Sequence, residues 1–419
     1  MDRVILHCDL NCFFASVELL SHPELRDVPT AVCGDPASRH GIILAKNEPA
    51  KRFGVQTAET IWQAKKKCPE LVLLPPHHGL YARYSRLVND IYREYTDLVE
   101  PFGIDESWLD VTGTLHLFGG DAEALADTLR RRVREELGLT LSVGVSFNKV
   151  FAKLGSDYRK PDATTVFSRE NWETLVRPLP AAALLGVGKA AQRTLSQYGI
   201  RTIGDMADAP EELMERLLGK LGLQLHAAAR GEDRSPVVGE AERAPVKSVG
   251  NGTTFPQDLV RLEEVQRALA ALSDSVASRL RQQGLVCGGV QVTLRYADFR
   301  TVSRQARLDH PTHLMKDICA GALALTKALW SAPDPIRMLT VTALYVTEES
   351  GSFQQLDLLE SRESRRQNER REKLERTMNG IREKYGRGSI VYGAAAGVPL
   401  REDGDDAAAA ESRENDHDF

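Results

Sequence analysis

Several features that would place this chain in a broad class are missing from its 419 residues. The six cysteines are scattered and include no Cys-x-x-Cys pair, so they suggest neither a zinc site nor a disulfide scaffold. No apolar run approaches the roughly twenty residues of a membrane helix, and the N-terminus lacks the basic, apolar and cleavage regions of a leader. We therefore expect a soluble, cytoplasmic protein with no membrane partner.

The chain also lacks the net positive charge that is usual for a nucleic-acid-binding protein, because its formal net charge is −5. The negative net charge comes from the C-terminal residues 401–419, which hold eight acids and two arginines. This composition predicts an acidic, disordered tail, and without it the body of the chain carries +1. Between Pro245 and Tyr345, twelve Lys or Arg stand against eight Asp or Glu, so cationic residues are concentrated there.

Three carboxylates occur at the ends of apolar, strand-like runs. Asp105 and Glu106 are adjacent, and Asp9 ends the run that begins at Val4. Like charges this close raise each other's pKa unless a cation lies between them. Mg²⁺ prefers such oxygen ligands and shares them with substrate phosphates, which points to two-metal phosphoryl or nucleotidyl transfer. For either segment alone, a helix N-cap or a solvated turn is an equally open interpretation.

The first 168 residues alternate predicted strands with predicted helices. Apolar residues at spacings of three and four predict one helix over 81–95 and another over 125–133, which ends at Gly138. Strands are expected at 4–6, 30–33, 71–74, 108–111, 141–145 and 165–167.

Residues 177–234 show a helical pattern with short glycine turns. Gly186, Gly188 and Lys189 precede a helix expected at 190–198, and a second Gly-x-x-Gly pair at 219–222 precedes another. Such turns let backbone N–H groups approach a phosphate at a helix N-terminus, so these residues are candidate DNA contacts. Ordinary helix C-caps are the alternative.

A polar linker is expected at 235–244, followed by a second α/β domain with helices at 262–282 and about 313–330. The predicted strands of this domain carry several arginines. Arg295 and Arg304 among them are candidate contacts to the backbone of a nucleic-acid duplex.

Several motifs occur in the order found in one enzyme family, at Cys8–Glu18, Asn47–Val55, Ile104–Asp110, Ser142–Lys153, Ser156–Pro161, Gly186–Gly188 and Ser248–Phe255. From about residue 3 to 348, the chain thereby resembles the Y-family (translesion) DNA polymerases, close to the bacterial DNA polymerase IV type. The resemblance implies a template-directed, low-fidelity DNA polymerase that extends a primer 3′-hydroxyl with dNTPs. It would act on primer-template DNA in translesion synthesis and damage tolerance, as a monomer.

The same resemblance implies an α+β, multidomain, right-hand architecture. Its parts would be a ferredoxin-like palm, small fingers, a helical thumb with helix-hairpin-helix motifs, and an α/β little finger. The expected ranges are palm 1–10 and 76–168, fingers 11–75, thumb 169–234, linker 235–244, little finger 245–348, linker with a clamp-binding motif 349–364, helical extension 365–400 and acidic tail 401–419.

Site residues follow from the resemblance by position. Asp9, Asp105 and Glu106 match the family's metal-binding triad, with the backbone carbonyl of Leu10 as a further ligand. Two Mg²⁺ ions per active site would support attack of the primer hydroxyl on the α-phosphate. The positions implied for nucleotide binding are Cys12, Phe13, Phe14, Lys51 and Lys160, with Phe14 as the steric gate against a 2′-hydroxyl.

One departure from the family pattern affects the nucleotide site. The family usually has Tyr and Arg as triphosphate contacts where this chain has Glu48 and Lys51. Lysine keeps the positive charge but loses the planar, bidentate fork of arginine. Glu48 places a carboxylate where an anion should dock, unless its side chain turns away or meets a partner such as Arg52. We expect weaker nucleotide affinity than is usual in the family.

A short segment beyond the little finger resembles the pentapeptide with which bacterial polymerases bind the sliding clamp. Its implied contacts are Gln355, Leu356, Leu358 and Leu359. The alternative is that these residues form the first turn of the helix that follows.

Two other functions compete with an active polymerase. A catalytically weakened, Y-family-like DNA-binding accessory protein of a mutasome would keep the fold; Glu48 favours it, and the three retained carboxylates oppose it. A nucleotidyl cyclase on a similar palm predicts neither the glycine turns nor the basic second domain.

Overall fold

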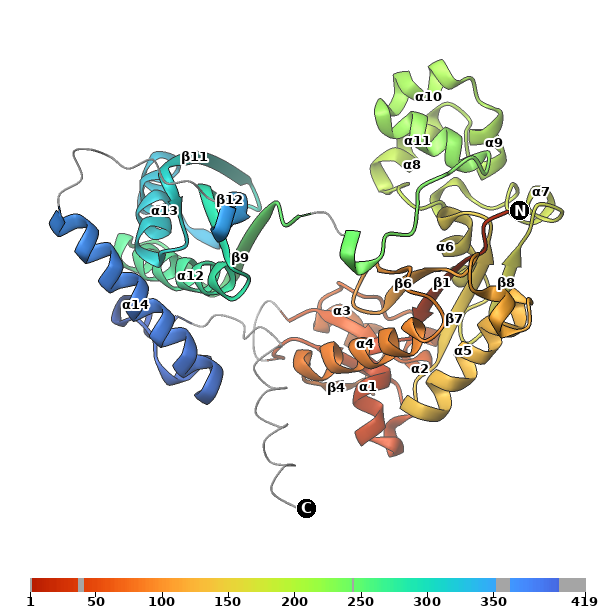
Figure 1. Cartoon of the computed structure of the whole chain (residues 1–419), viewed down its shortest axis with the longest axis horizontal. Helices are drawn as coiled ribbons and strands as arrows, with labels where there is room; N and C mark the ends of the chain where they lie inside the picture. Colours follow the sequence, from red (N-terminus) through yellow and green to blue (C-terminus); the bar gives the residue numbers. More distant parts are fainter. Residues whose placement is uncertain (1, 37–40, 243–244, 352–361, 399–419) are drawn as a thin grey trace. The chain divides into compact units, whose positions relative to one another are not determined.

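The structure is a computed structural model that describes residues 2–36, 41–242, 245–351 and 362–398 (Figure 1). The described residues form two compact units, which divide between positions 243 and 244. Each unit has its own sheet and its own hydrophobic core.

The first unit is built on a five-stranded sheet in the order β5-β6-β1-β7-β8. Strand β1 pairs antiparallel with both β6 and β7, so it occupies the centre. The six strands predicted in this half of the chain are confirmed, but β5 was missed because it is three residues long and ends in proline. The bounds are β1 Ile5–Leu10, β5 Val99–Pro101, β6 Glu106–Asp110, β7 Leu141–Ser146 and β8 Thr164–Phe167.

Helices cover both faces of this sheet. On one face, α4 (His78–Arg93) and α5 (Ala122–Leu137) pack against Leu6, Cys8 and Leu10 of β1. Alternate residues of a strand point to opposite faces, so His7 and Asp9 project toward α6 (Lys149–Tyr158) on the other face. The polar residues of β1 are thereby separated from the apolar core.

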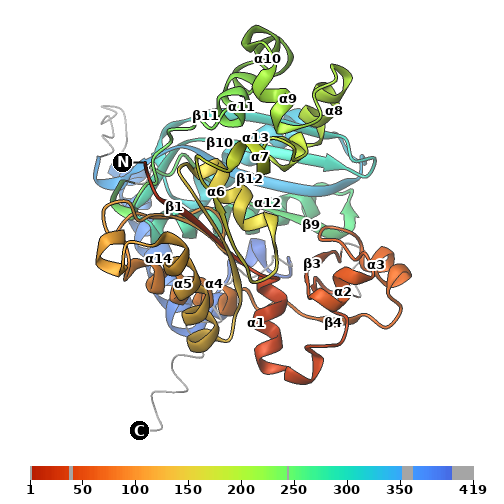
Figure 2. The ribbon, with the colours of Figure 1, turned by 90° about the vertical axis from the view of Figure 1, so that its right-hand side faces the viewer.

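A smaller three-stranded sheet, ordered β3-β2-β4, follows β1 and α1 in the chain (Figure 2). Helix α3 starts at a capping box, in which the Thr60 side chain accepts from Gln63 N–H and Gln63 accepts from Thr60 N–H. Strand β3 was not predicted, because its four residues, ILAK, show no alternation. The bounds are α1 Phe13–Ser21, β2 Thr30–Cys33, β3 Ile43–Lys46, α2 Glu48–Arg52, α3 Ile61–Lys67 and β4 Val72–Leu74.

Short helices form a compact group after β8 (Figure 1). Gly219, with φ at 61°, forms the turn between two of them. The expectation that Gly222 belongs to the same turn is wrong, because Gly222 lies inside α11 and packs against α10. A Cβ atom there would lie 2.0 Å from the carbonyl oxygen of Met214. The bounds are α7 Trp172–Leu175, α8 Lys189–Gln197, α9 Ile203–Asp208, α10 Glu211–Leu218 and α11 Lys220–Ala229.

The first half of the predicted linker is packed onto the first unit. Val237 is buried with Ile5 and Trp108, and the backbone N–H of Val238 donates to Glu100 at 2.8 Å. The buried valine explains why this stretch is held on the five-stranded sheet despite its polar composition.

The second unit contains a four-stranded sheet in the order β11-β10-β12-β9, with α12 and α13 on one face. Strand β9 was missed because Gly250 and Gly252 interrupt its pattern. The bounds are β9 Ser248–Leu259, α12 Leu262–Gln282, β10 Leu285–Tyr296, β11 Thr301–Thr312, α13 Met315–Leu329 and β12 Ile336–Glu348.

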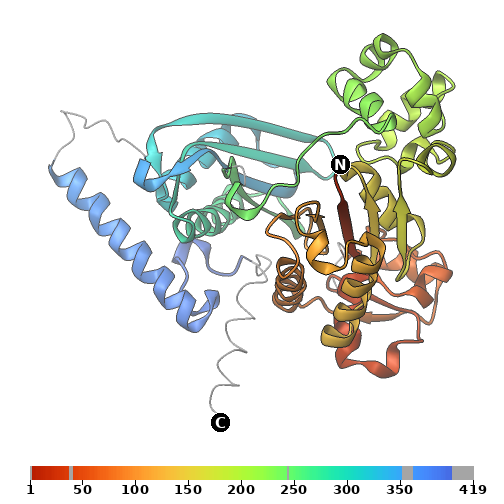
Figure 3. The same ribbon diagram turned by 45° about the vertical axis from the view of Figure 1, so that its right-hand side comes forward.

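Helix α14 (Arg362–Tyr385) returns along α12 (Figure 3). Its contacts are buried and charged: Arg382 donates to the two Asp274 carboxylate oxygens at 3.1 and 2.7 Å, and Arg281 pairs with Glu375. The predicted clamp-binding residues 355–359 lie outside the described residues. Among the helices described here, none has the length and apolarity needed to cross a bilayer.

Candidate active site

Asp9 and Glu106 are cross-strand partners in the central sheet. Directly paired residues project from the same face, here the face toward α6. Asp9 is only 5% exposed. Like charges in this arrangement destabilise a sheet, so nearby cations must offset them.

Gly144 of β7 explains how those cations reach the site. A Cβ atom at this position would lie 1.9 Å from the carbonyl oxygen of Ala152, so the close approach of α6 requires glycine. This approach brings Lys153 and Ser156 of α6 against β1. One small residue in the strand therefore determines which side chains surround the carboxylates.

Two lysines contact the carboxylate pair. Lys153 Nζ lies 3.1 Å from Asp9 Oδ2 and 3.0 Å from Glu106 Oε2. Lys160 Nζ lies 2.6 Å from the same oxygen of Asp9. Asp157 contacts both lysines, at 3.2 and 2.7 Å. The result is a compact cluster of alternating charge at the end of β1.

Asp105 lies beside this cluster. The Leu10 N–H donates to its carbonyl oxygen at 3.0 Å, which holds the segment against the end of β1. Burial, together with the negative charges of Asp9 and Glu106, raises the pKa of Asp105 to about 6. Burial opposes ionisation of Glu106 as well, but His7 and Lys153 outweigh it and lower that pKa. Two adjacent carboxyl groups thus differ in their affinity for a proton.

His7 is a component of the site that sequence reasoning missed. Its Nδ1 lies 2.8 Å from Ser156 Oγ, its Nε2 lies 3.3 Å from Glu106 Oε2, and its ring packs edge-on against Trp108. Ser156 also donates its hydroxyl hydrogen to the Lys153 carbonyl at 2.8 Å, so its side chain is fixed between α6 and the imidazole. Alternation along the run Ile5–Asp9 was the available signal, because it places His7 on the face of Asp9.

The donor set fits a hard divalent cation. Ligand atoms of His7, Asp9 and Glu106 lie within 4.8 Å of one another, and two of the three residues offer carboxylate oxygens. The lysine ammonium groups already show that this point attracts positive charge. Asp105 is adjacent, and its carboxylate offers a further oxygen once it loses its proton. The backbone carbonyl of Leu10 keeps its role as a predicted ligand.

The residues after Asp9 turn sharply into α1. Cys12 is the N-cap residue of this helix and has the left-handed conformation, with φ at 52°. Phe13 is 3% exposed and belongs to the core. Phe14 is partly exposed and stacks on Tyr81, with ring centroids 4.0 Å apart, while the Tyr81 hydroxyl bonds Glu18. The Phe14 ring therefore rests on a fixed support.

Glu48 has a partner other than the expected one. Its Oε1 accepts a hydrogen bond from Lys51 Nζ at 2.6 Å and from the Cys12 thiol at 3.2 Å. Arg52, the partner suggested from the sequence, makes no ion pair among the described residues. The two positions that depart from the family pattern thus neutralise each other.

The predicted DNA contacts lie on separate surfaces. Gly188 caps α8 and Gly186 has φ at 96°, so both stand at the start of that helix beside exposed Lys189. In the second unit, Arg295 pairs with Thr301 and projects from the sheet face without helices. Arg304 pairs with the buried Val292 and therefore projects from the opposite face of the edge strand.

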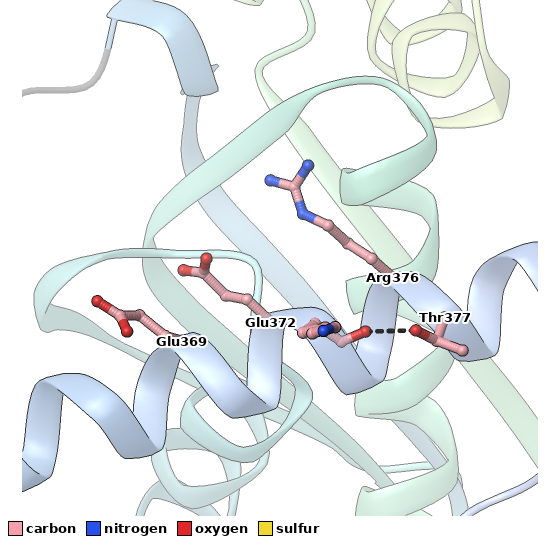
Figure 4. A pocket seen from close by; sticks show the side chains of 5 residues that line it. Glu369, Glu372, Arg376 and Thr377 are labelled. Atoms are coloured by element: carbon pink, nitrogen blue, oxygen red, sulfur yellow. Dashed lines mark hydrogen bonds between the residues drawn. The ribbon is translucent and has the colours of Figure 1, made fainter.

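A hollow of about 470 Å³ lies along α14 in the second unit (Figure 4). Its lining mixes acids and bases, and Arg376 is already paired with Glu349 at 2.8 Å. It shares no residue with the carboxylate cluster.

Comparison with known proteins identifies the family. A solved structure titled a Y-family DNA polymerase chimera, Dbh-Dpo4(243-245)-Dbh, shares the fold with a TM-score of 0.73 and 22% identity, over 82% of this chain and 99% of that chain. DNA polymerase IV of Acetivibrio thermocellus is 44% identical over 96% of this chain and 99% of its own length. The chain belongs to the Y family of DNA polymerases. DNA polymerase IV 1 of Bacillus subtilis is 37% identical over 94% and 93% of the two chains.

Family models agree with this membership. Residues 8–157 match the impB/mucB/samB family, 246–358 match its C-terminal domain, and 182–233 match a DNA polymerase-iota thumb domain. The chain is accordingly a DNA-directed DNA polymerase, and the predicted fold class is confirmed.

Proposed function

We propose that this polymerase extends primers by two-metal nucleotidyl transfer with Mg²⁺ and serves translesion synthesis in DNA damage tolerance. The observation that carries the proposal is the cross-strand pair Asp9–Glu106, with Asp105 beside it and Lys153 and Lys160 on its oxygens. Asp9, Asp105 and Glu106 would hold the metal, and the names of the relatives are consistent with the cellular role.

Bound Mg²⁺ would lower the pKa of the primer 3′-hydroxyl and stabilise the charge of the leaving pyrophosphate. The chain's own residues would position the nucleotide. Lys160 reaches Asp9 and is partly exposed, so it is available to the triphosphate once that carboxylate has another partner. Phe14, supported by Tyr81, would lie beneath the sugar and exclude a 2′-hydroxyl.

Primer extension with Glu106→Ala and Asp105→Ala tests the assignment. Extension should fall by several orders of magnitude while affinity for primer-template DNA is retained, because binding rests on other surfaces. Asp90→Ala, which removes an exposed carboxylate paired with Arg93, is the matched control. Full extension by both site variants would refute the metal assignment.

Recruitment by the sliding clamp is a further part of the proposal. Leu356, Leu358 and Leu359 would fill an apolar pocket on the clamp, and Gln355 would hydrogen-bond at its edge. A tether raises the local concentration of the polymerase at the primer end. Alanine at 355, 358 and 359 should abolish stimulation by a loaded clamp and leave unassisted extension unchanged. Equal stimulation of this variant and the parent would assign the segment to the following helix.

The second candidate is a catalytically weakened polymerase that serves mainly as a DNA-binding accessory protein of a mutasome, and the Glu48–Lys51 pair favours it. That pair reduces the positive charge available to a triphosphate. Template-directed addition by the unmodified chain at ordinary dNTP concentrations would exclude this candidate.

A further inference from the structure

Trp62 is the most exposed large apolar side chain among the described residues, at 71%. It follows Ile61, whose side chain packs on the core of the small sheet. Successive residues of a helix point about 100° apart, so fixing Ile61 inward turns the indole outward. The capping box at Thr60 sets this rotation at the start of α3. The exposure of Trp62 therefore results from a well-defined helix start.

The chain segment that contains Trp62 is rich in cations. From Lys46 to Lys67 the chain has six Lys or Arg and two Glu, and both glutamates are already paired with lysines. Lys65 and Lys66 have no carboxylate partner in the described part of the chain. Lys66 Nζ lies 5.5 Å from the Trp62 ring centroid, so a cation and an aromatic face are presented together.

This combination matches one class of ligand. Proteins that bind single-stranded nucleic acid use aromatic rings on which bases stack and cations that follow the backbone. Protein-binding surfaces, in contrast, are depleted in lysine. The DNA substrate of a polymerase includes such a single strand, because the template ahead of the primer end is unpaired. The charge and the exposed ring are complementary to that strand.

We propose that Trp62, with Lys65 and Lys66, is a stacking platform for unpaired template bases ahead of the primer end. This site is distinct from the carboxylate cluster and from the nucleotide-binding residues. It would keep the template strand extended and slow its dissociation, independently of the base sequence.

Overhang length provides the test. For a primer-template with a 5′ overhang of about five nucleotides, Trp62→Ala should weaken binding about tenfold, whereas affinity for a blunt duplex should stay unchanged. Trp62→Phe should restore most of the loss, since it keeps a stacking face. Leu117→Ala, at another exposed apolar residue (67%) of the same unit, is the matched control. Template 2-aminopurine ahead of the primer end should lose fluorescence with the parent and regain it with Trp62→Ala.

Salt dependence provides a second readout. Lys65→Ala combined with Lys66→Ala should reduce the slope of log affinity against log salt by about 1.4 for the overhang substrate, from two single-strand phosphate contacts. Arg131→Ala, on an exposed face of α5, should leave it unchanged. Equal losses on blunt and overhang DNA would overturn the proposal. An unchanged affinity of Trp62→Ala for overhang DNA would overturn it as well. If this variant lost only its stimulation by the clamp, Trp62 would contact a protein instead of the template.

Discussion

Replacing Glu48 with Gln should strengthen nucleotide binding. Glu48 Oε1 accepts from Lys51 at 2.6 Å and from the Cys12 thiol at 3.2 Å. Burial opposes its ionisation, but these hydrogen bonds outweigh burial and lower the pKa of Glu48 below its usual value, so it is charged at neutral pH. Glutamine keeps the shape and an acceptor oxygen while it removes the charge. Lys51 is then released to meet the triphosphate.

The size of the effect follows from the exposure of the pair. The side chains are 37% and 40% exposed, and ion pairs of this kind contribute about 0.2–1 kcal/mol. A gain of at most about 1 kcal/mol corresponds to a factor of about five in affinity. The Kd for dNTP should therefore fall by up to about fivefold. The gain should shrink at high salt because the pair is near the surface.

Single-turnover incorporation at varied dNTP concentration measures this Kd, since a steady-state KM equals it only when chemistry is slow. Glu59→Gln is the control, because Glu59 pairs with Lys67 instead. In a Lys51→Ala background, Glu48→Gln should have no effect if the two act as a pair. An unchanged or weaker affinity in the single variant would show that Lys51 does not reach the triphosphate.

Three further outcomes are expected. Phe14→Ala should raise ribonucleotide incorporation by about tenfold or more, equivalent to about 1.4 kcal/mol; unchanged discrimination would place the gate elsewhere. Below pH about 6 the raised pKa keeps Asp105 protonated, so the apparent Mg²⁺ affinity should fall with decreasing pH, and in Asp105→Asn this dependence should disappear. Asp274→Ala leaves the buried Arg382 guanidinium without its carboxylate partner and should destabilise the second unit by about 3–5 kcal/mol in urea unfolding, whereas Asp274→Leu with Arg382→Met should recover most of the loss. A loss below about 1 kcal/mol would mean that water reaches the pair.

The sequence was most informative about the site where ionisable side chains stand at the ends of predicted strands. Asp9, Asp105 and Glu106 became candidates because they stand at the ends of apolar runs, and strands β1 and β6, which carry Asp9 and Glu106, are confirmed. Elements with weak patterns were missed, such as β9, whose glycines carry no side chains to alternate.

Contacts that depend on the register between strands could not be predicted from the sequence. Arg295 and Arg304 look equivalent along the chain, yet the pairing of β10 with β11 puts them on opposite sheet faces. Glu48 illustrates the same limit on a helix, where partners three and four residues away are both neighbours. The five-residue helix α2 brings Lys51 and not Arg52 to its carboxylate.

The lysines at the carboxylate pair have a consequence for substrate binding. Lys153 and Lys160 offset two like charges that sheet pairing forces together. A cation bound by Asp9 and Glu106 would compete with both ammonium groups. Asp157 would still contact each lysine, at 3.2 and 2.7 Å, so neither would be left without a partner. Under the proposed mechanism, the released positive charge would face the incoming triphosphate, and metal binding would be coupled to nucleotide binding through Lys153 of α6 and Lys160 in the segment that follows it.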